Sequence, residues 1–152
     1  MKMKKHRYLT RVIVFLLLVS MVLPVLGSAA VIEPDRPYAS YYLNTYSAYI
    51  AALGGGKVAA CFSVAGTTTL DEIGALRVIV EESTDNANWY SVASYHYSSN
   101  PSMIGYGKVL HSGSVTYNGV VGRYYRAYIT IWGGKDGGGD TRYLWTSSKQ
   151  AT

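Results

Sequence analysis

The polar side chains suited to catalysis are few, and they are separated along the sequence. The histidines after residue 30 are His96 and His111, which fall on different predicted strands with no nearby His or Cys at a metal-ligand spacing. Glu81 and Glu82 are neighbours in one predicted strand, so their carboxylates point to opposite faces and cannot share a substrate. Nucleophilic, acid–base and metal catalysis each require a tighter grouping of side chains. The sequence therefore predicts no catalytic residues, no metal site and no cofactor, and we expect the chain not to be an enzyme.

Two glycine-rich segments look like ligand loops but lack the partner residues of such loops. Residues 54–57, Gly-Gly-Gly-Lys, are followed by Val58 instead of Ser or Thr, and no helical pattern follows. Residues 136–140, Asp-Gly-Gly-Gly-Asp, lack the alternating oxygen ligands of a calcium loop. The first segment is predicted to be a hairpin loop and the second a flexible connection between strands.

Aromatic side chains are the unusual part of the composition. The chain has 15 Tyr and 3 Trp, of which only Tyr8 precedes residue 30. Tyrosine combines an apolar ring with a polar tip and few torsions, which suits recognition surfaces. Such rings can stack on sugar rings, with Arg126 and His111 supplying hydrogen bonds. The predicted ligand-binding residues are Tyr124, Arg126, Tyr128, His111 and Trp132. The alternative is that these aromatics only stabilise a sheet by cross-strand pairing.

His111 joins this site through a predicted hairpin at Asn118-Gly119. A two-residue Asn-Gly loop favours a type I′ turn, because both central residues take a positive φ. The turn would pair Val109 with Tyr128. Since paired residues share a face, His111 would then lie on the face of Tyr128.

The strands that must position these residues follow from a period of two in the apolar residues after residue 39. Strands are predicted at 40–52, 57–65, 75–82, 88–97, 106–117, 120–132 and 141–147. A single helical turn is predicted at 68–74, with Asp71-Glu72 in it and Gly74 at its end. Seven short strands separated by turns are typical of an all-β, antiparallel two-sheet sandwich, here over residues 39–152. Cys61 is the only cysteine, so no intramolecular disulfide can form, and it is predicted to be buried between two apolar layers.

The first 30 residues have the pattern of a secretory signal peptide. Five basic residues precede the apolar run 12–26, and Ser28-Ala29-Ala30 supplies a small-residue cleavage site. The run is shorter than the roughly 20 residues that a membrane-spanning helix needs. We expect cleavage near Ala30 and a secreted protein with no stable membrane span. The alternative is a chain tethered to the membrane by an uncleaved N-terminal segment.

The charge of the exported part differs from that of the whole chain. Residues 1–30 hold five of the 14 Lys and Arg and none of the 9 Asp and Glu, which leaves nine charges of each sign. Net neutrality, without a run of Lys or Arg, argues against a nucleic-acid partner. Residues 31–38 are polar and contain two prolines, so they are predicted to form an extended leader.

The segment 122–130, Gly-Arg-Tyr-Tyr-Arg-Ala-Tyr-Ile-Thr, resembles the penultimate strand of immunoglobulin-like and fibronectin-like sandwiches. The resemblance implies that Tyr124 or Tyr125 bonds back to the backbone near the start of the strand. Together with Asp71–Ala75, the Asn88-Trp89 strand start and Asp140–Arg142, this segment is similar to small secreted proteins of Gram-positive, clostridial-type bacteria, a family of unknown function. That resemblance implies a secreted domain and no particular activity.

These observations favour a secreted, non-enzymatic binding or adhesion module, with a glycan, another cell-surface polymer or a surface protein as the partner. The alternative is a structural or self-assembling extracellular protein. In that case a tyrosine-rich edge strand, such as residues 41–46, would pair with another chain.

Overall fold

The computed structural model describes residues 40–152, and the predicted signal peptide (1–30) and leader (31–38) lie outside this range. The described residues are all-β apart from one short 3-10 turn, η1 (Pro101–Met103). The strands are β1 (Leu43–Gly54), β2 (Lys57–Ser83), β3 (Tyr90–His96), β4 (Ile104–Asn118), β5 (Tyr124–Lys135), β6 (Gly138–Trp145) and β7 (Lys149–Gln150). All their pairings are antiparallel.

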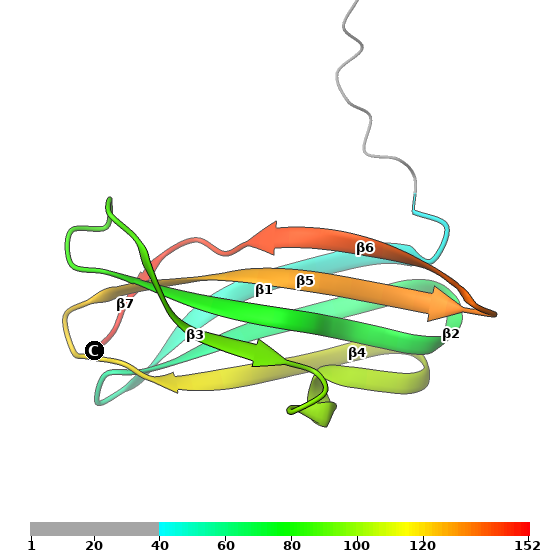
Figure 1. The fold of residues 1–152 in the computed structure, drawn as a ribbon, viewed down its shortest axis with the longest axis horizontal. Coiled ribbons are helices and arrows are strands. Elements are labelled where there is room, and N and C mark those ends of the chain that lie inside the picture. Colours follow the sequence, from blue (N-terminus) through cyan, green and yellow to red (C-terminus); the bar gives the residue numbers. More distant parts are fainter. Residues whose placement is uncertain (1–39) are drawn as a thin grey trace, which may run out of the picture. The chain divides into compact units, whose positions relative to one another are not determined.

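Strand β2 organises the fold because it belongs to two layers. Its first part pairs with β1 and β4, and its second part pairs with β5 and β3 and, at residues 70–74, also with β4. A register shift between Ala65 and Leu70 separates the two parts. In Figure 1, β1, β4 and the first part of β2 form a rear layer, while β3, the second part of β2, β5 and β6 form a front layer. The predicted all-β, antiparallel, sandwich-like fold is confirmed, and both layers belong to one hydrogen-bonded sheet of seven strands.

The helical turn predicted at residues 68–74 is wrong, because these residues belong to β2. Ile73 is fully buried and pairs with Gly105 of β4 and with Gly133 of β5. An extended backbone can bond to strands on both sides, which a single helical turn cannot. Gly74 permits this close approach, since an added Cβ would lie 2.1 Å from the Met103 carbonyl oxygen.

The hairpin predicted at Asn118-Gly119 is also wrong. Strand β4 pairs with β2, where Tyr117 lies opposite Val58, and it does not pair with β5. Neither Asn118 nor Gly119 has a positive φ. Instead, the segment 119–123 joins the rear layer to the front layer. The first part of β2 offers β4 a long partner with an apolar inner face, and this pairing outweighs the local turn preference.

Two positive φ values of the kind that a type I′ turn requires occur elsewhere, at Asp136 (52°) and Gly137 (79°). These two residues connect β5 to β6, where Lys135 pairs with Gly138. The connection predicted to be flexible is therefore a two-residue hairpin. The predicted hairpin loop at the glycines before Lys57 is confirmed, because β1 and β2 pair across it.

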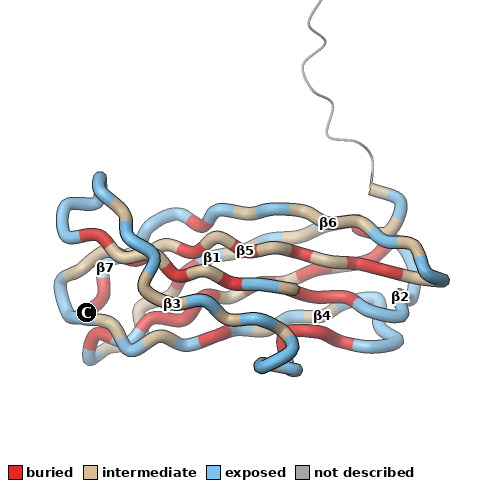
Figure 2. The backbone as a smooth tube through the Cα atoms, viewed as in Figure 1, coloured by how far each residue is buried: buried red, intermediate tan, exposed pale blue. Residues whose placement is uncertain are grey.

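The core lies between the two layers and comes mainly from alternate residues of β2 and β5. Figure 2 shows this alternation along β5, where buried residues follow intermediate ones. Burial of these side chains supplies the main force that holds the layers together. The largest of the fully buried side chains are Tyr125, Leu70, Ile73, Met103, Ile129 and Ile131.

The predicted burial of Cys61 is wrong. Cys61 is half-buried and lies opposite Tyr49 of β1 and Ser114 of β4. Its neighbours Ala60 and Phe62 point into the core, so Cys61 points to the outer face of the rear layer. The alternation correctly predicts that Cys61 faces away from Ala60 and Phe62, but among residues 40–152 no second apolar layer covers this outer face.

Candidate binding face

The outer face of the front layer has a group of aromatic side chains on β5 and β6. Because the odd-numbered residues from Tyr125 to Ile131 are buried, the even-numbered residues of β5 point outward. Antiparallel pairing places Trp145 opposite Tyr128 and Tyr143 opposite Thr130. A further ring, Trp89, comes from the loop between β2 and β3. We call the group Trp89, Arg126, Tyr128, Tyr143 and Trp145 the aromatic face.

Arg126 lies between two tryptophans at one end of the aromatic face. Its guanidinium carbon is 4.4 Å from the centroid of the Trp89 ring and 4.5 Å from that of Trp145. The guanidinium also donates to the Glu81 carboxylate, with Nε at 2.8 Å and Nη2 at 2.7 Å from Oε2. A planar cation held this way restricts the rotamers of both rings, since each ring has a preferred position over it.

The rings continue across the face from Trp145 to Tyr143. The Tyr128 ring is 4.7 Å from the Trp145 ring, tilted by 44°, and 5.9 Å from the Tyr143 ring, parallel to within 1°. Such tilted and stacked pairs are favourable aromatic arrangements. Tyr143 and Trp145 nevertheless remain 62% and 53% exposed. The aromatic face is therefore internally ordered and still offers a large apolar area to solvent.

The structure brings together only part of the predicted site. Arg126 and Tyr128 lie in the aromatic face, and Tyr124 and Trp132 lie on the same outer side of β5, before and after it. His111 is separate, since it lies on β4, contacts the Phe62 ring and bonds through Nε2 to the Ser102 carbonyl. The prediction for His111 failed because it depended on the wrong hairpin.

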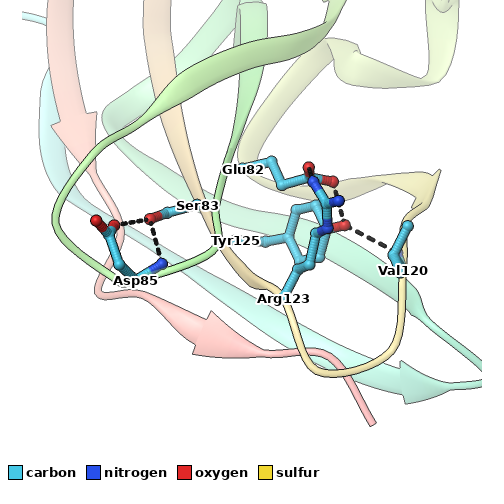
Figure 3. A network of polar contacts seen from close by, with 6 residues as sticks. All are labelled: Glu82, Ser83, Asp85, Val120, Arg123 and Tyr125. Atoms are coloured by element: carbon cyan, nitrogen blue, oxygen red, sulfur yellow. Dashed lines mark hydrogen bonds and ion pairs between the residues drawn. The ribbon is translucent and has the colours of Figure 1, made fainter.

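A partly buried network of polar contacts fixes the start of β5 (Figure 3). The hydroxyl of Tyr125 donates to Glu82 and accepts from the backbone N–H of Val120 at 2.8 Å, and Arg123 also bonds to Glu82. Burial, together with the bond to Glu82, raises the pKa of Tyr125 to about 12. Of Tyr124 and Tyr125, it is Tyr125 that bonds back to the backbone, five residues upstream.

The loop that holds Trp89 is organised by Asp85. Its carboxylate accepts from the backbone N–H groups of Ala87 and Asn88, at 2.9 and 2.8 Å, and from the side chains of Ser83 and Asn88. These bonds, led by those to Asn88 and Ala87, hold the pKa of Asp85 well below its usual range. Trp89 directly follows Asn88 in the chain, so the bonds that Asp85 makes to Asn88 help to set the position of the Trp89 ring.

The arrangement is suited to non-covalent recognition. It combines exposed ring faces and edges with a guanidinium and with hydroxyl groups at Tyr128 and Tyr143. Within residues 40–152, no three His, Cys, Asp or Glu side chains group as metal ligands. Nor does this range contain a helix of the length and hydropathy needed to cross a bilayer.

Sequence reasoning missed Tyr143, Trp145, Trp89 and Glu81 as members of the site. The alternation of residues 141–147 places Tyr143 and Trp145 on one face, and this signal was available. The pairing of β6 with β5, which brings that face beside Tyr128, comes only from the topology. The contact between Trp89 and Arg126 depends on a loop, for which no periodicity exists.

Comparison with known proteins adds little to this description. No protein-family model matches the chain, and no curated protein matches its sequence. Among solved structures, Spo0M, a sporulation control protein from Bacillus subtilis, is similar with a TM-score of 0.34 and 12% identity over 70% of this chain. This chain spans about half of that one, 51% of its length. A likeness of this extent transfers no function.

Proposed function

We propose that this protein is a secreted, non-enzymatic binding module whose aromatic face recognises a glycan or another cell-surface polymer. The observation that supports the proposal is the exposure of Tyr143 and Trp145 in a group whose other members hold them in place. An exposed aromatic area of this kind lowers solubility, so its presence on a surface usually reflects a partner. Rings already fixed by their neighbours lose little entropy on binding.

The ligand class follows from the chemistry of the face. Aromatic rings bind the apolar C–H faces of sugars, while hydroxyl and guanidinium groups bond to sugar hydroxyls. The charge of Arg126 is already paired with Glu81 at 2.7 Å. The face therefore presents no unpaired cation from this residue for a polyanion, which favours hydroxyl-rich polymers over nucleic acid.

The test is binding of the full chain, expressed and purified, to a panel of glycans and cell-wall polymers. Tyr143→Ala and Trp145→Ala should each weaken binding about ten-fold, because each removes an exposed ring from the proposed site. Tyr49→Ala is the matched control, since Tyr49 is similarly exposed (60%) but lies on β1 in the rear layer. Equal losses in all three variants, or unchanged binding in the first two, would contradict the proposal.

A second candidate function is self-assembly through β1. This strand has 12 residues and pairs only with β2 within the described chain, and Tyr49 and Leu53 on it are exposed. A long edge strand offers backbone groups that can pair with another chain. Sedimentation over a range of concentrations should then show oligomers that Tyr49→Lys disrupts. A wild-type chain that stays monomeric would rule this function out.

A further inference from the structure

A cleft lies on the same outer face of β5, beyond the aromatic face. Its volume is about 270 Å³ and its lining includes Asp71, Glu72, Trp132 and Lys135. Tyr128 and Trp132 are four residues apart on one strand, so they are separated by ~13 Å at a rise of about 3.3 Å per residue. Between them on β5 lies Thr130, which is opposite Tyr143 of β6 on one side and opposite the exposed Arg77 of β2 on the other. The aromatic face and the cleft therefore lie along the same outer face of the front layer, about four residues apart on β5.

The position of Trp132 depends on two glycines. A Cβ added at Gly139 would lie 2.2 Å from the far edge of the indole, and one added at Gly134 would lie 2.7 Å from it. The six-membered part of the indole therefore fills the space above these residues. The indole Nε1 donates to Glu72 Oε2 at 3.2 Å, which fixes its direction. Because Gly134 of β5 and Gly139 of β6 have no side chains, the Trp132 indole can lie against the sheet.

The polar lining of the cleft consists mainly of acceptors. Asp71 Oδ2 accepts from the backbone N–H of Asp136 at 2.8 Å, and Glu72 accepts from the indole as above. Among residues 40–152, no protein donor bonds to the other oxygen of either carboxylate. Lys135 adds a donor at the rim. An aromatic ring beside carboxylate oxygens and an ammonium matches the C–H face and the hydroxyl groups of a sugar.

We infer that the cleft at Trp132 is a second sugar subsite, and that one extended neutral polysaccharide chain occupies both the cleft and the aromatic face. This inference rests on the proposed function and specifies its ligand. The charges near the cleft favour a neutral chain, since Asp71, Glu72 and Asp136 outnumber Lys135. A polyuronate or another anionic polymer would meet like charge there, which costs binding energy.

The experiment measures the affinity of the full chain for soluble neutral glucan and mannan oligomers of increasing length. For the wild type, the affinity should rise by about ten-fold or more once an oligomer spans both sites, because the second contact becomes intramolecular. Trp132→Ala should abolish this rise, so that long oligomers bind no more tightly than short ones. Gly139→Ala should act in the same way, because it displaces the ring without removing it, and Trp132→Phe should restore part of the rise. A polyuronate of matched length should bind more weakly than the neutral chain.

The outcomes separate this inference from the proposed function. If Tyr143→Ala weakens binding while Trp132→Ala and Gly139→Ala keep the full length dependence, the second subsite is wrong and the binding face stands. If the polyuronate binds more tightly than the neutral oligomers, the ligand class is wrong. If the folded wild type binds no neutral oligomer of any length, the inference is overturned. The proposed function fails as well if no polymer of the wider panel binds.

Discussion

Tyr125 is the largest side chain that the fold buries completely, and its hydroxyl joins Glu82 to the backbone of Val120. Tyr125→Phe would leave the N–H of Val120 without its acceptor and would remove one donor from Glu82. We expect a loss of about 1–3 kcal/mol in the free energy of unfolding. The shift in the midpoint of chemical denaturation, at an unchanged m-value, measures this loss.

Alkaline titration gives a matched readout for the same residue. The pKa of Tyr125 is about 12 in the folded chain, above the ordinary value near 10, so the folded state retains a proton that the unfolded state has lost. The contribution is complete below about pH 10 and is lost as the pH rises towards 12. The wild type should therefore lose stability over this range more steeply than Tyr125→Phe. Parallel curves for the two proteins would contradict the assignment.

Arg126 illustrates how a planar cation differs from a compact one. Arg126→Lys keeps the charge opposite Glu81 but cannot stack between Trp89 and Trp145. We expect a loss of about 1 kcal/mol in stability, together with a changed tryptophan emission spectrum. Arg77→Lys is the control, because Arg77 bonds to Ser94 through Nε. An unchanged emission spectrum in Arg126→Lys would show that the stacking does not fix the rings.

At this scale the sequence predicted which side chains share a strand face, and little more. The period of two places Tyr124, Arg126, Tyr128 and Trp132 together correctly, since side-chain direction in a strand is local. The partners of these residues across the sheet depend on strand order. His111 was misplaced, and Trp145 was omitted, for that reason.

The β2–β3 loop shows that one element can depend on a single carboxylate. Asp85→Ala removes the acceptor of the Ala87 and Asn88 amides, so hydrogen exchange at these amides should accelerate and Trp89 should become less ordered. Since the pKa of Asp85 is lowered in the folded chain, its contribution to stability is present above about pH 4 and falls as acid protonates the group. Asp71→Ala, at a distant acceptor of one backbone amide, should leave the exchange of this loop unchanged. Slow exchange at both amides in Asp85→Ala would contradict this role.

Among the elements, the existence of strands was predictable and their partners were not. Alternation identified most strands, including those of the front layer. It did not show that the two predicted strands 57–65 and 75–82 are one strand, because the join at Thr68–Gly74 has the residues of a capped turn. The hairpin predicted at Asn118-Gly119 was wrong because the long-range pairing of β4 with β2 outweighs a local turn preference.

For the whole molecule, export remains a prediction from residues 1–30. Their basic start, apolar run and small residues predict cleavage after Ala30. Expression of the full chain with export, followed by N-terminal sequencing, should recover a protein in the medium that begins at Val31. A cell-bound protein that keeps Met1 would instead support the tethered alternative. The expected neutral charge of the exported chain fits a protein that finds its ligand by contact rather than by electrostatic steering.

The most direct test of the central claim uses the three tryptophans, all of which lie on the outer face of the front layer. The protein is titrated with each polymer of the panel while binding and intrinsic tryptophan emission are followed together. The proposed binding face predicts an emission change that saturates with the binding isotherm and that weakens in Trp145→Ala. Saturable binding with no change in emission would place the ligand elsewhere on the molecule and contradict the account.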